Sequence, residues 1–477
     1  MTSWGERLRC LTVSSALLAL VTSAAARAHA GDVCVTGDCS CVGDCNEDGM
    51  VVINELVSLV SIALDESPPS ACPGAHCSGD TVDVACIVSA VHPALVGCPV
   101  RPTTAGIVFN GEDNRLNAYV PGPGFPKQTV IPSAADVPGG VGRDLNAQIC
   151  FTHGPEGQLR FIGGEDTNQG SGHNTAGWGF FNLTGTAVGD FHYEEIGKLI
   201  PTYQTTADGA ENYGCGFLSD GRLLTTDVGN QASGDPNGQL IIWFPPFDTG
   251  ANYTATGVVP GTPVHYCKLD IAIGTAQQIA IDDQDRVYVA SARPGGDPGA
   301  GIYRYTGPFP TSDQPDGGCN TMDDTGAPMA TGIMKERFIP NDAHLITPSG
   351  IVIKPGGGFY ISSVINGVIA EYGSQGQYVG TIVEATVPGF PIPTGSPLGI
   401  GLASDGTIYY ADIGLVADSH GIGPGNHTGT VRRIRFVDGQ PQPPETMDTH
   451  LDFPDGIGIL EFPTPGVSTA AADSNAR

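Results

Sequence analysis

The sequence has little positive charge and, after its first thirty residues, no long hydrophobic run. Lys and Arg number 21 against 50 Asp and Glu in 477 residues, which gives a formal net charge of −29. A surface this acidic repels phosphate backbones and anionic membranes, so the composition argues against nucleic acid as a partner. A transmembrane helix needs ~20 mostly apolar residues, and no later segment meets that requirement, which argues against a span in the mature protein.

Several catalytic signatures are also missing. The sequence contains no G-x-S-x-G, H-E-x-x-H, Walker loop or G-x-G-x-x-G motif. Serine hydrolases of the nucleophile-elbow type, zincins and nucleotide-binding enzymes therefore lose their usual support. The Gly and Pro counts, 68 and 38, are high and predict a globular chain with many loops.

The first thirty residues have the organisation of a secretory signal peptide. Arg7 and Arg9 precede an apolar run over residues 16–26, and Ala28-His29-Ala30 supplies the small-x-small cleavage site. We expect cleavage near Ala30 and a secreted product, extracellular or periplasmic. The mature chain then has 21 minus 3 basic and 50 minus 1 acidic residues, a formal charge of −31. This charge suits divalent cations, although acidity also serves solubility alone.

Cysteine is the clearest sign of two domains. Only Cys10 of the 13 cysteines lies in the leader, and the even twelve that remain in an exported chain predict disulfides. A zinc cluster at Cys39, Cys41 and Cys45 is the alternative. The density falls near residue 100, where we place a domain boundary. Eight cysteines precede it and four follow: Cys34, Cys39, Cys41, Cys45, Cys72, Cys77, Cys86 and Cys98, then Cys150, Cys215, Cys267 and Cys319.

Residues 44–55 have the spacing of an EF-hand calcium loop. Oxygen-bearing groups stand at positions 1, 3, 5 and 12, and Gly49 at position 6 permits the sharp turn. Position 9 is Val52, where a water completes the shell, and the apolar residues that follow have helical periodicity. A solvated acidic turn is the alternative. The predicted ligands are Asp44, Asn46, Asp48, the Met50 carbonyl and Glu55.

Residues 41–99 resemble a dockerin-type module, in which two such loop-helix units pack together, and we assign residues 31–99 to it. The resemblance implies a cohesin-like or cell-surface partner, with a simple spacer as the alternative. The second unit keeps its helix, residues 87–95, but two cysteines offer a covalent staple in place of an ion site. Four residues replace its expected oxygen ligands: Ala75, Cys77, Gly79 and Cys86.

A nine-residue phrase repeats along the rest of the chain. Residues 404–412 (SDGTIYYAD) combine a polar turn, a short apolar strand and a carboxylate, and residues 219–227 and 283–291 repeat the pattern. Looser copies occupy residues 155–163 and 355–363. Such self-similarity marks a repeat architecture. The residue before each apolar strand falls at 158, 222, 286, 358 and 407, so the repeats are 64, 64, 72 and 49 residues apart.

The repeats predict a mainly β fold, because short strands separated by Gly, Asp and Pro turns lack helical periodicity. A further copy near residues 115–120 brings the number to six, and a late strand at residues 456–460 would pair with the first blade and close the ring. We therefore expect a six-bladed β-propeller over residues 105–465 and a flexible tail over residues 466–477. An array of β-sandwiches is the alternative.

The phrase P-x-G-I followed by D-G-x-I-Y-x-A-D resembles the blades of the NHL, SMP-30/gluconolactonase and paraoxonase-like propellers. Residues 396–400, 347–351 and 453–457 match it best. Such phrases specify the blade and not the chemistry. For the hydrolase members, the resemblance implies one channel metal that polarises a lactone carbonyl or activates water. Their metal-binding Asn has only Asn212 as a counterpart, shifted toward the start of its blade.

The loops after the second strands are expected to open toward the central channel. Asp227, Asp412 and Glu165 are therefore the predicted channel ligands for a hard cation such as Ca²⁺, and hydrogen bonding to loop amides is the alternative. The expected ring residues are Gly163, Asp227, Ser291, Ser363 and Asp412, with Glu165 and Asp166 just beyond the first.

His344 is the candidate general base, because it precedes a blade where the channel mouth is expected. His153 follows an inner strand, and His420 and His427 lie in the last long loop. Residues 178–181 (WGFF) are either an aromatic ligand face or blade core.

Two classes of function follow from these patterns. The first is a calcium-binding propeller that binds a glycan, a protein or a small molecule at its face and is presented by the N-terminal module. The second is a Ca²⁺-dependent hydrolase of a lactone or ester, with Asp227, Asp412 and Glu165 as ligands and His344 as base. The two serines and the glycine in the expected ring favour the first class.

Overall fold

The computed structural model divides the chain into two compact units, Met1–Cys34 with Asp38–Arg101, and Val35–Gly37 with Pro102–Arg477. We describe each unit by itself. The structure describes residues 42–43, 45, 51, 53–64, 67–68, 71–72, 82 and 84–96 of the first, and 106–112, 114–133, 136, 145–165, 177–199, 212–228, 238–250, 252–254, 257–259, 261–292, 299–323, 326–383, 395–418, 421–437 and 439–462 of the second.

The described part of the N-terminal unit contains two helices, α2 (Ile53–Ala63) and α3 (Val84–Val96). Leu59 and Ile62 of α2 pack with Ala90 of α3 in a small core. The same core includes a disulfide between Cys45 and Cys72, and Cys86 also lies in a disulfide. The signal peptide and four of the predicted calcium ligands lie outside the described residues: Asp44, Asn46, Asp48 and Met50.

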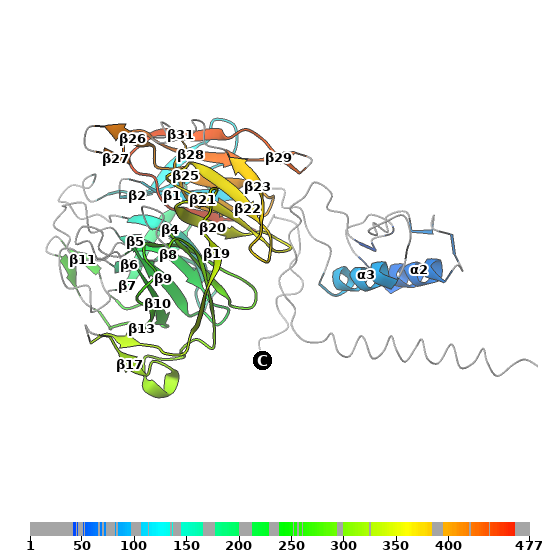
Figure 1. The fold of residues 1–477 in the computed structure, drawn as a ribbon, viewed down its shortest axis with the longest axis horizontal. Helices are drawn as coiled ribbons and strands as arrows, with labels where there is room; N and C mark the ends of the chain where they lie inside the picture. The colour runs from blue at the N-terminus through cyan, green and yellow to red at the C-terminus, as the bar shows by residue number, and fades with distance from the viewer. Residues whose placement is uncertain are drawn as a thin grey trace, which may run out of the picture. The chain divides into compact units, whose positions relative to one another are not determined.

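The described part of the C-terminal unit is a six-bladed β-propeller (Figure 1). Five blades are four-stranded sheets, and the third carries two additional short strands at its outer edge. We number the blades 1 to 6 in chain order. Their inner strands are, in turn, β32 (Ile457–Leu460), β4 (Leu145–His153), β8 (Asn212–Phe217), β14 (Ala276–Ile281), β20 (Pro348–Ile353) and β24 (Pro397–Leu402).

The inner strands form a closed ring, because each contacts the inner strands of both neighbouring blades. β32 pairs antiparallel with the second strand of blade 1, with Ile457 opposite Asn110. The predicted closure of the ring by the late strand is therefore confirmed. The second strands of blades 1 to 6 are β1 (Ile107–Glu112), β5 (Leu159–Glu165), β9 (Leu223–Asp227), β15 (Val287–Ser291), β21 (Phe359–Ser363) and β25 (Ile408–Asp412).

Two more antiparallel strands complete each blade. The third strands are β2 (Arg115–Tyr119), β6 (Gly177–Thr184), β10 (Gln239–Phe244), β16 (Gly301–Thr306), β22 (Val368–Tyr372) and β28 (Gly429–Ile434). The outer strands are β3 (Lys127–Ile131), β7 (His192–Leu199), β13 (His265–Asp270), β19 (Met334–Pro340), β23 (Tyr378–Val383) and β31 (Glu445–Leu451). Insertions add β11 (Asn252–Thr254), β12 (Gly257–Val259), β17 (Thr321–Met322), β18 (Pro328–Met329), β26 (Leu415–Asp418), β27 (Gly421–Pro424), β29 (Phe436–Val437), β30 (Gln440–Pro441) and the 3-10 turn η3 (Pro315–Gly317).

Each gap between neighbouring blades is filled by its own hydrophobic cluster. The second strands contribute to the clusters on both sides, because successive side chains of a strand point to opposite faces. In β25, Tyr409 packs toward blade 1 and Tyr410 packs toward blade 5. Burial on both faces explains why the repeated strands are continuous apolar runs and do not alternate with polar residues.

Glycine sets the spacing of the inner strands. The third position of the P-x-G-I phrase lies at a register shift near the start of the strand, against the carbonyl of the next blade. A Cβ atom at Gly399 would lie 2.2 Å from the Asp455 carbonyl oxygen, and one at Gly456 would lie 1.5 Å from that of Ala147. Real Cβ atoms are not found that close, so these positions require glycine.

Two disulfides tie neighbouring blades together. Cys150 of β4 bonds Cys215 of β8, and Cys267 of β13 bonds Cys319 in the insertion that follows β16. Beside the second bridge, Lys268 and Asp323 form a buried ion pair. With the bridge in the N-terminal unit, these disulfides indicate an oxidising compartment. Within the described ranges, no helix is long and apolar enough to cross a membrane.

We predict that Gly456→Ala destabilises the propeller by roughly 1–3 kcal/mol, because the added methyl group forces apart the inner strands of blades 1 and 2. Urea unfolding followed by circular dichroism measures the change. Gly380→Ala in β23 is the matched control, since a Cβ there meets nothing within 4 Å. Equal midpoints for the two variants would show that the close approach is not needed.

Candidate functional site at the channel mouth

The ends of the second strands form a ring, as the repeats predicted, but its membership differs from the prediction in two blades. Pro397 pairs with Asp412, Pro348 with Ser363, Ala276 with Ser291 and Asn212 with Asp227. The last residue of the second strand therefore lies opposite the first residue of the inner strand in blades 3 to 6. Blade 1 adds Glu112, and blade 2 adds Glu165 in place of Gly163.

Glu165 takes the ring place because the first hairpin of blade 2 is longer than the others. The strand β4 runs for 9 residues whereas β8 runs for 6, so the pairing ends at Glu165 opposite Leu145. The sequence prediction aligned the turn and not the strand ends, and so it placed Gly163 in the ring. Glu112 was missed because blade 1 takes its inner strand from the end of the chain.

Ring side chains brace the loops that lead into the inner strands. Asp412 accepts hydrogen bonds from the backbone N–H groups of Gly395, Ser396 and Gly414, at 3.0, 2.8 and 3.1 Å. Arg432 lies 3.3 Å from the same buried carboxylate. In blades 4 and 5 a serine hydroxyl replaces the carboxylate and also bonds to the loop before the inner strand. Ser291 donates to the Ile273 carbonyl, and Ser363 accepts from the N–H of Thr347.

Blade 3 brings Asp227 and Asn212 together. The two residues are paired across β9 and β8, and both are buried. The Asn212 amide donates to the Gly177 carbonyl at 2.8 Å. Among the described residues, no group of three or more acidic, histidine or cysteine side chains is placed to hold a metal ion. Metal binding by Asp227, Asp412 and Glu165 stays a prediction.

A second set of residues lies closer to the propeller axis. At the second position of the P-x-G-I phrase, side chains from blades 2, 3 and 6 meet in one hydrophobic cluster, so they lie near the axis around which the blades are arranged. Apolar residues that follow the second strands cover the same cluster. Its buried members are Ala147, Tyr213, Val228, Val364, Leu398, Ile413 and Leu415. The variable residue of P-x-G-I was the sequence signal for this set, and our prediction overlooked it.

Asp455 is the charged residue at this second position. Its two carboxylate oxygens accept the N–H of Ala147, at 3.0 and 2.9 Å, and one of them also accepts the N–H of Gly456. Tyr213 reaches across from blade 3 and donates to the Asp455 carbonyl at 2.9 Å. Burial, with the nearby Asp455 carboxylate, raises the pKa of Tyr213 well above its ordinary value. These contacts join blades 1, 2 and 3.

Two glutamines fill the next layer of the ring of inner strands. Gln148 of blade 2 accepts from the N–H groups of Cys215 and Ile279 and donates to the Ile279 carbonyl. Gln278 of blade 4 makes the equivalent bonds to blades 5 and 6, donating to the carbonyls of Ile351 and Ile400 at 3.2 and 2.8 Å. Each side chain therefore links three consecutive blades where the other blades have glycine.

The candidate base lies at the outer edge of blade 5. The His344 ring stacks on Tyr378 of β23, with ring centroids 4.0 Å apart, and the His344 carbonyl accepts from Asn366. Neither contact brings the imidazole to Asp227 or Asp412. His427 pairs with Asp452 at 2.9 Å.

The remaining candidates from the sequence are placed as follows. Residues 178–181 form the buried core of β6, so the alternative of a blade core is confirmed and they are not an aromatic ligand face. His153 ends β4, on the side of the hairpin turn. His420 and Asp166 lie outside the described residues.

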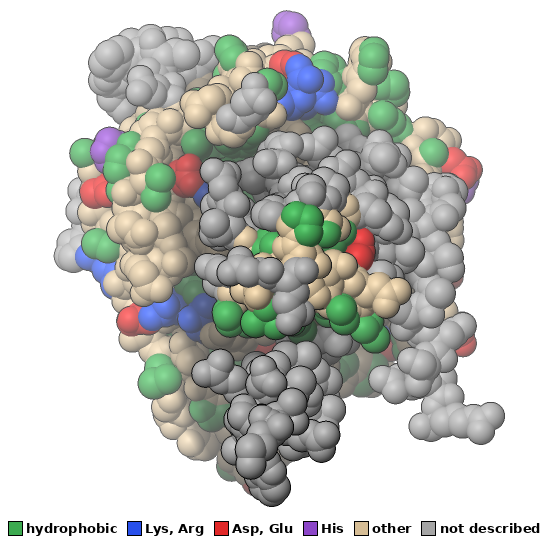
Figure 2. Space-filling view, turned by 90° about the vertical axis from the view of Figure 1, so that its right-hand side faces the viewer, with side chains coloured by type: hydrophobic (Ala, Val, Ile, Leu, Met, Phe, Trp, Pro, Cys, Tyr) green, Lys and Arg blue, Asp and Glu red, His purple; other side chains and the backbone are tan. Residues whose placement is uncertain are grey.

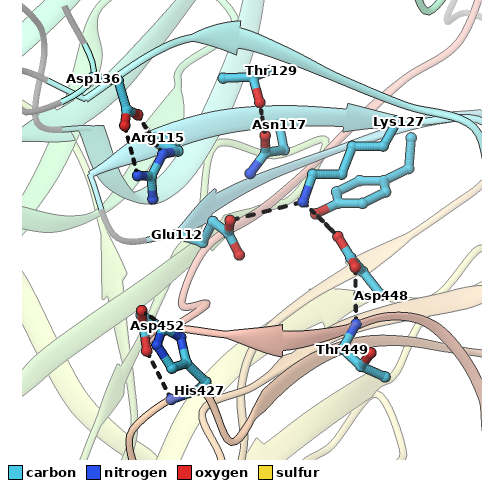
Figure 3. A network of polar contacts seen from close by, with 11 residues as sticks. Glu112, Arg115, Asn117, Lys127, Thr129, Asp136, His427, Asp448, Thr449 and Asp452 are labelled. Atoms are coloured by element: carbon cyan, nitrogen blue, oxygen red, sulfur yellow. Dashed lines mark hydrogen bonds and ion pairs between the residues drawn. The ribbon is translucent and has the colours of Figure 1, made fainter.

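Glu112 belongs to a polar network between blades 1 and 6 (Figure 3). Lys127 lies between two carboxylates, 3.9 Å from Glu112 and 2.7 Å from Asp448, and the Tyr119 hydroxyl donates to Asp448 at 3.0 Å. The Glu112 carboxyl is buried beside Lys127 and Asn117. Burial raises the pKa of this carboxyl above its ordinary value of 4.5, although Lys127 opposes the shift.

Comparisons with known proteins give a likeness of fold. Neither a family model nor a curated protein matches the chain. A luciferin-regenerating enzyme is 13% identical over 71% of this chain and 92% of its own, with a TM-score of 0.38. Virginiamycin B lyase from Staphylococcus aureus is 12% identical over 72% and 84%, with a TM-score of 0.33. An aldose sugar dehydrogenase from Streptomyces coelicolor is 12% identical over 62% and 79%, with a TM-score of 0.35. Their activities are statements about those proteins.

We predict that Glu112→Gln raises stability at neutral pH and not in acid. Because the folded-state pKa is raised, the contribution of Glu112 to stability is fully present below its unfolded pKa and is lost as the pH rises through the folded pKa. An uncharged amide avoids that loss, so the variant should gain about 1 kcal/mol over wild type at pH 7 and little at pH 4. Urea midpoints at both pH values measure the difference.

Asp448→Asn is the control for the same network. This change removes the negative charge nearer to Lys127 and leaves Tyr119 with a neutral amide as its acceptor, so it should lower stability at pH 7. A fall in stability for Glu112→Gln at pH 7 would mean that the Lys127 ion pair outweighs the burial of the carboxylate.

Proposed function

We propose that this protein is a secreted propeller that binds an extracellular ligand without transforming it, and that its N-terminal module holds one calcium ion and attaches it to a partner. The proposal of binding without catalysis rests on the hydrogen bonds made by the carboxylates nearest the propeller axis. The side-chain oxygens of Asp455 and Asp412 accept backbone N–H groups of the loops that enter the inner strands. These carboxylates hold the scaffold, and a hard cation would have to displace those bonds.

The calcium proposal rests on Glu55, the described ligand of the loop. Its side chain is buried at the start of α2, and one carboxylate oxygen accepts the N–H of Cys45 at 2.9 Å. Cys45 stands at position 2 of the loop, so the last side chain of the loop folds back to its beginning. This arrangement fits a closing ligand, which together with Asp44, Asn46, Asp48 and the Met50 carbonyl would hold Ca²⁺.

The attachment proposal rests on exposed apolar side chains at the start of both helices. Ile53 and Val57 of α2 are 78% and 57% exposed, and Val84 and Val88 of α3 are 73% and 56% exposed. Both pairs occupy the first and fifth residues of their helix, so each pair forms an apolar ridge on one face. Hydrophobic side chains at the surface appear in green in Figure 2. A cohesin-like or other cell-surface protein is the proposed partner.

A second candidate function is metal-dependent hydrolysis of a lactone or ester. The observation that favours it is the cross-strand pair of Asn212 and Asp227 in blade 3, the residue types that the resemblance implies for a channel metal. In that case Glu165 from blade 2 would join the ligand set, and His344 would need to move from its stack on Tyr378 to act as base.

We predict that the purified mature protein contains one calcium per chain and that Asp44→Ala abolishes it while Asp227→Ala does not. Elemental analysis after dialysis against metal-free buffer gives the stoichiometry. Loss of an ion in Asp227→Ala, accompanied by loss of hydrolysis of γ- and δ-lactones or aryl esters, would replace binding by the hydrolase. Asp283→Ala, in an exposed turn, is the control for a general loss of acidic charge.

A further inference from the structure

An insertion from blade 4 lies on the outer edge of blade 3. Its short strand β18 pairs in parallel with β13, with Met329 opposite Lys268, and β17 pairs with β18 at the margin of the sheet (Figure 1). The disulfide between Cys267 and Cys319 fastens the start of the insertion to β13. The N–H of Ala330 donates to the Lys268 carbonyl at 2.8 Å. The insertion is therefore held against the outer strand of a neighbouring blade.

Lys268 and Asp323 form an ion pair next to this disulfide, and each of the two side chains is only 2% exposed. Among the ion pairs of the described residues, no other has both side chains buried to this extent. Lys335 and Asp270, for comparison, are 30% and 12% exposed. Lys268 thus places a primary amine against a carboxyl group at a position that excludes water.

The surroundings of the pair are apolar. Tyr266 lies two residues before Lys268 on the same face of β13. Ala327 follows Asp323 in the insertion, and both Tyr266 and Ala327 belong to the hydrophobic cluster between blades 2 and 3. Taking two charges out of water is costly, even when they are paired. A reaction that removes both charges is therefore favoured here more than at the surface.

The Asp323 carboxyl is oriented by its own turn. The Asp323 N–H donates to the Ala327 carbonyl at 3.0 Å, and the N–H of Gly326 donates to the Asp323 carbonyl at 3.1 Å. In the side chain, Oδ1 accepts the N–H of Ala327 at 2.9 Å, while Oδ2 faces the Lys268 amine. The two carboxyl oxygens therefore have different partners. The N–H at Oδ1 is placed to stabilise negative charge, and the ammonium beside Oδ2 is a source of protons.

We propose that Lys268 and Asp323 join in an intramolecular amide, or isopeptide, bond. One proton passes from the ammonium to Oδ2, which leaves a neutral amine and a neutral carboxyl group. The Nζ lone pair attacks Cγ, and the Ala327 N–H holds the charge that develops on Oδ1. A second proton moves from Nζ to Oδ2, the Cγ–Oδ2 bond breaks and water leaves. The ammonium supplies both protons and its third hydrogen stays on the amide, so no other reactant is needed.

The neighbouring disulfide assists this reaction by proximity. Cys267 precedes Lys268 directly, so the bridge to Cys319 keeps the amine and the carboxyl in contact, and fixed contact is what makes intramolecular reactions fast. The amide would in turn hold the insertion to β13 when the disulfide is reduced. This inference goes beyond the proposed function and does not depend on it.

The test is mass spectrometry of tryptic peptides from the full chain as it is secreted. Reduction and alkylation come first, because the disulfide joins the same two peptides. Trypsin does not cleave after a lysine whose amine is in an amide. We therefore expect residues 223–286 and 305–335 as one branched peptide, with a mass lower by one water than the sum of the two.

Three variants assign the bond. Lys268→Met and Asp323→Ala should each abolish the branched peptide, and Asp323→Ala should also restore cleavage after Lys268. Lys335→Met is the matched control, because it removes the amine of the more exposed pair with Asp270 and should leave the cross-link in place. The wild-type digest decides the question even if a variant fails to fold.

Two results would overturn the inference. Separate peptides 223–268, 269–286 and 305–335 in the reduced wild-type digest would show that the pair is ionic only. A branched peptide that persists in Asp323→Ala would place the bond at another carboxyl group. The calcium and lactone measurements on Asp227→Ala decide the proposed function separately.

Discussion

The propeller depends on how closely its inner strands approach one another. At four of the six blades a glycine in the phrase faces a carbonyl of the next blade, with room for a hydrogen atom and no more: Gly214, Gly350, Gly399 and Gly456. In blades 2 and 4 a glutamine stands at the same place and reaches the two blades that follow. Neighbouring inner strands are thus held together either by direct backbone contact at a glycine or by the side-chain amide of a glutamine. Both arrangements allow six strands to close into a ring around a narrow axis.

This constraint separates the scaffold from the sites at which a ligand can be held. The carboxylates nearest the axis are tied to backbone amides, and the residues that converge there are mostly apolar. The interface between blades 6 and 1 differs, because it contains the network of Glu112, Lys127 and Asp448. This charged network therefore lies where the two ends of the ring meet.

The repeated phrase was sufficient to predict the architecture and the closing strand, because glycine turns and double-sided burial leave a direct trace in local sequence. The ring was predicted only in part. The prediction missed the ring position of Glu165 because the hairpin of blade 2 is longer than the others. It missed Glu112 because the inner strand of blade 1 comes from the other end of the chain. Such shifts depend on pairing and not on local pattern. The stacking of Arg433 on Phe125 between blades 6 and 1 was not predicted at all, since the two residues are about 300 positions apart in the sequence.

The placement of β32 in blade 1 also sets an order of events for a chain that folds as it is synthesised. The side-chain amide of Asn110 donates to the carbonyl of Gly456, 346 residues later, so this bond cannot form until the end of the chain has been made. The bridges Cys150–Cys215 and Cys267–Cys319 span only 65 and 52 residues, so oxidation can fasten the middle blades while the first still presents an open edge. Synthesis of the last segment therefore ends the interval in which this edge is available to chaperones, to proteases or to a second nascent chain.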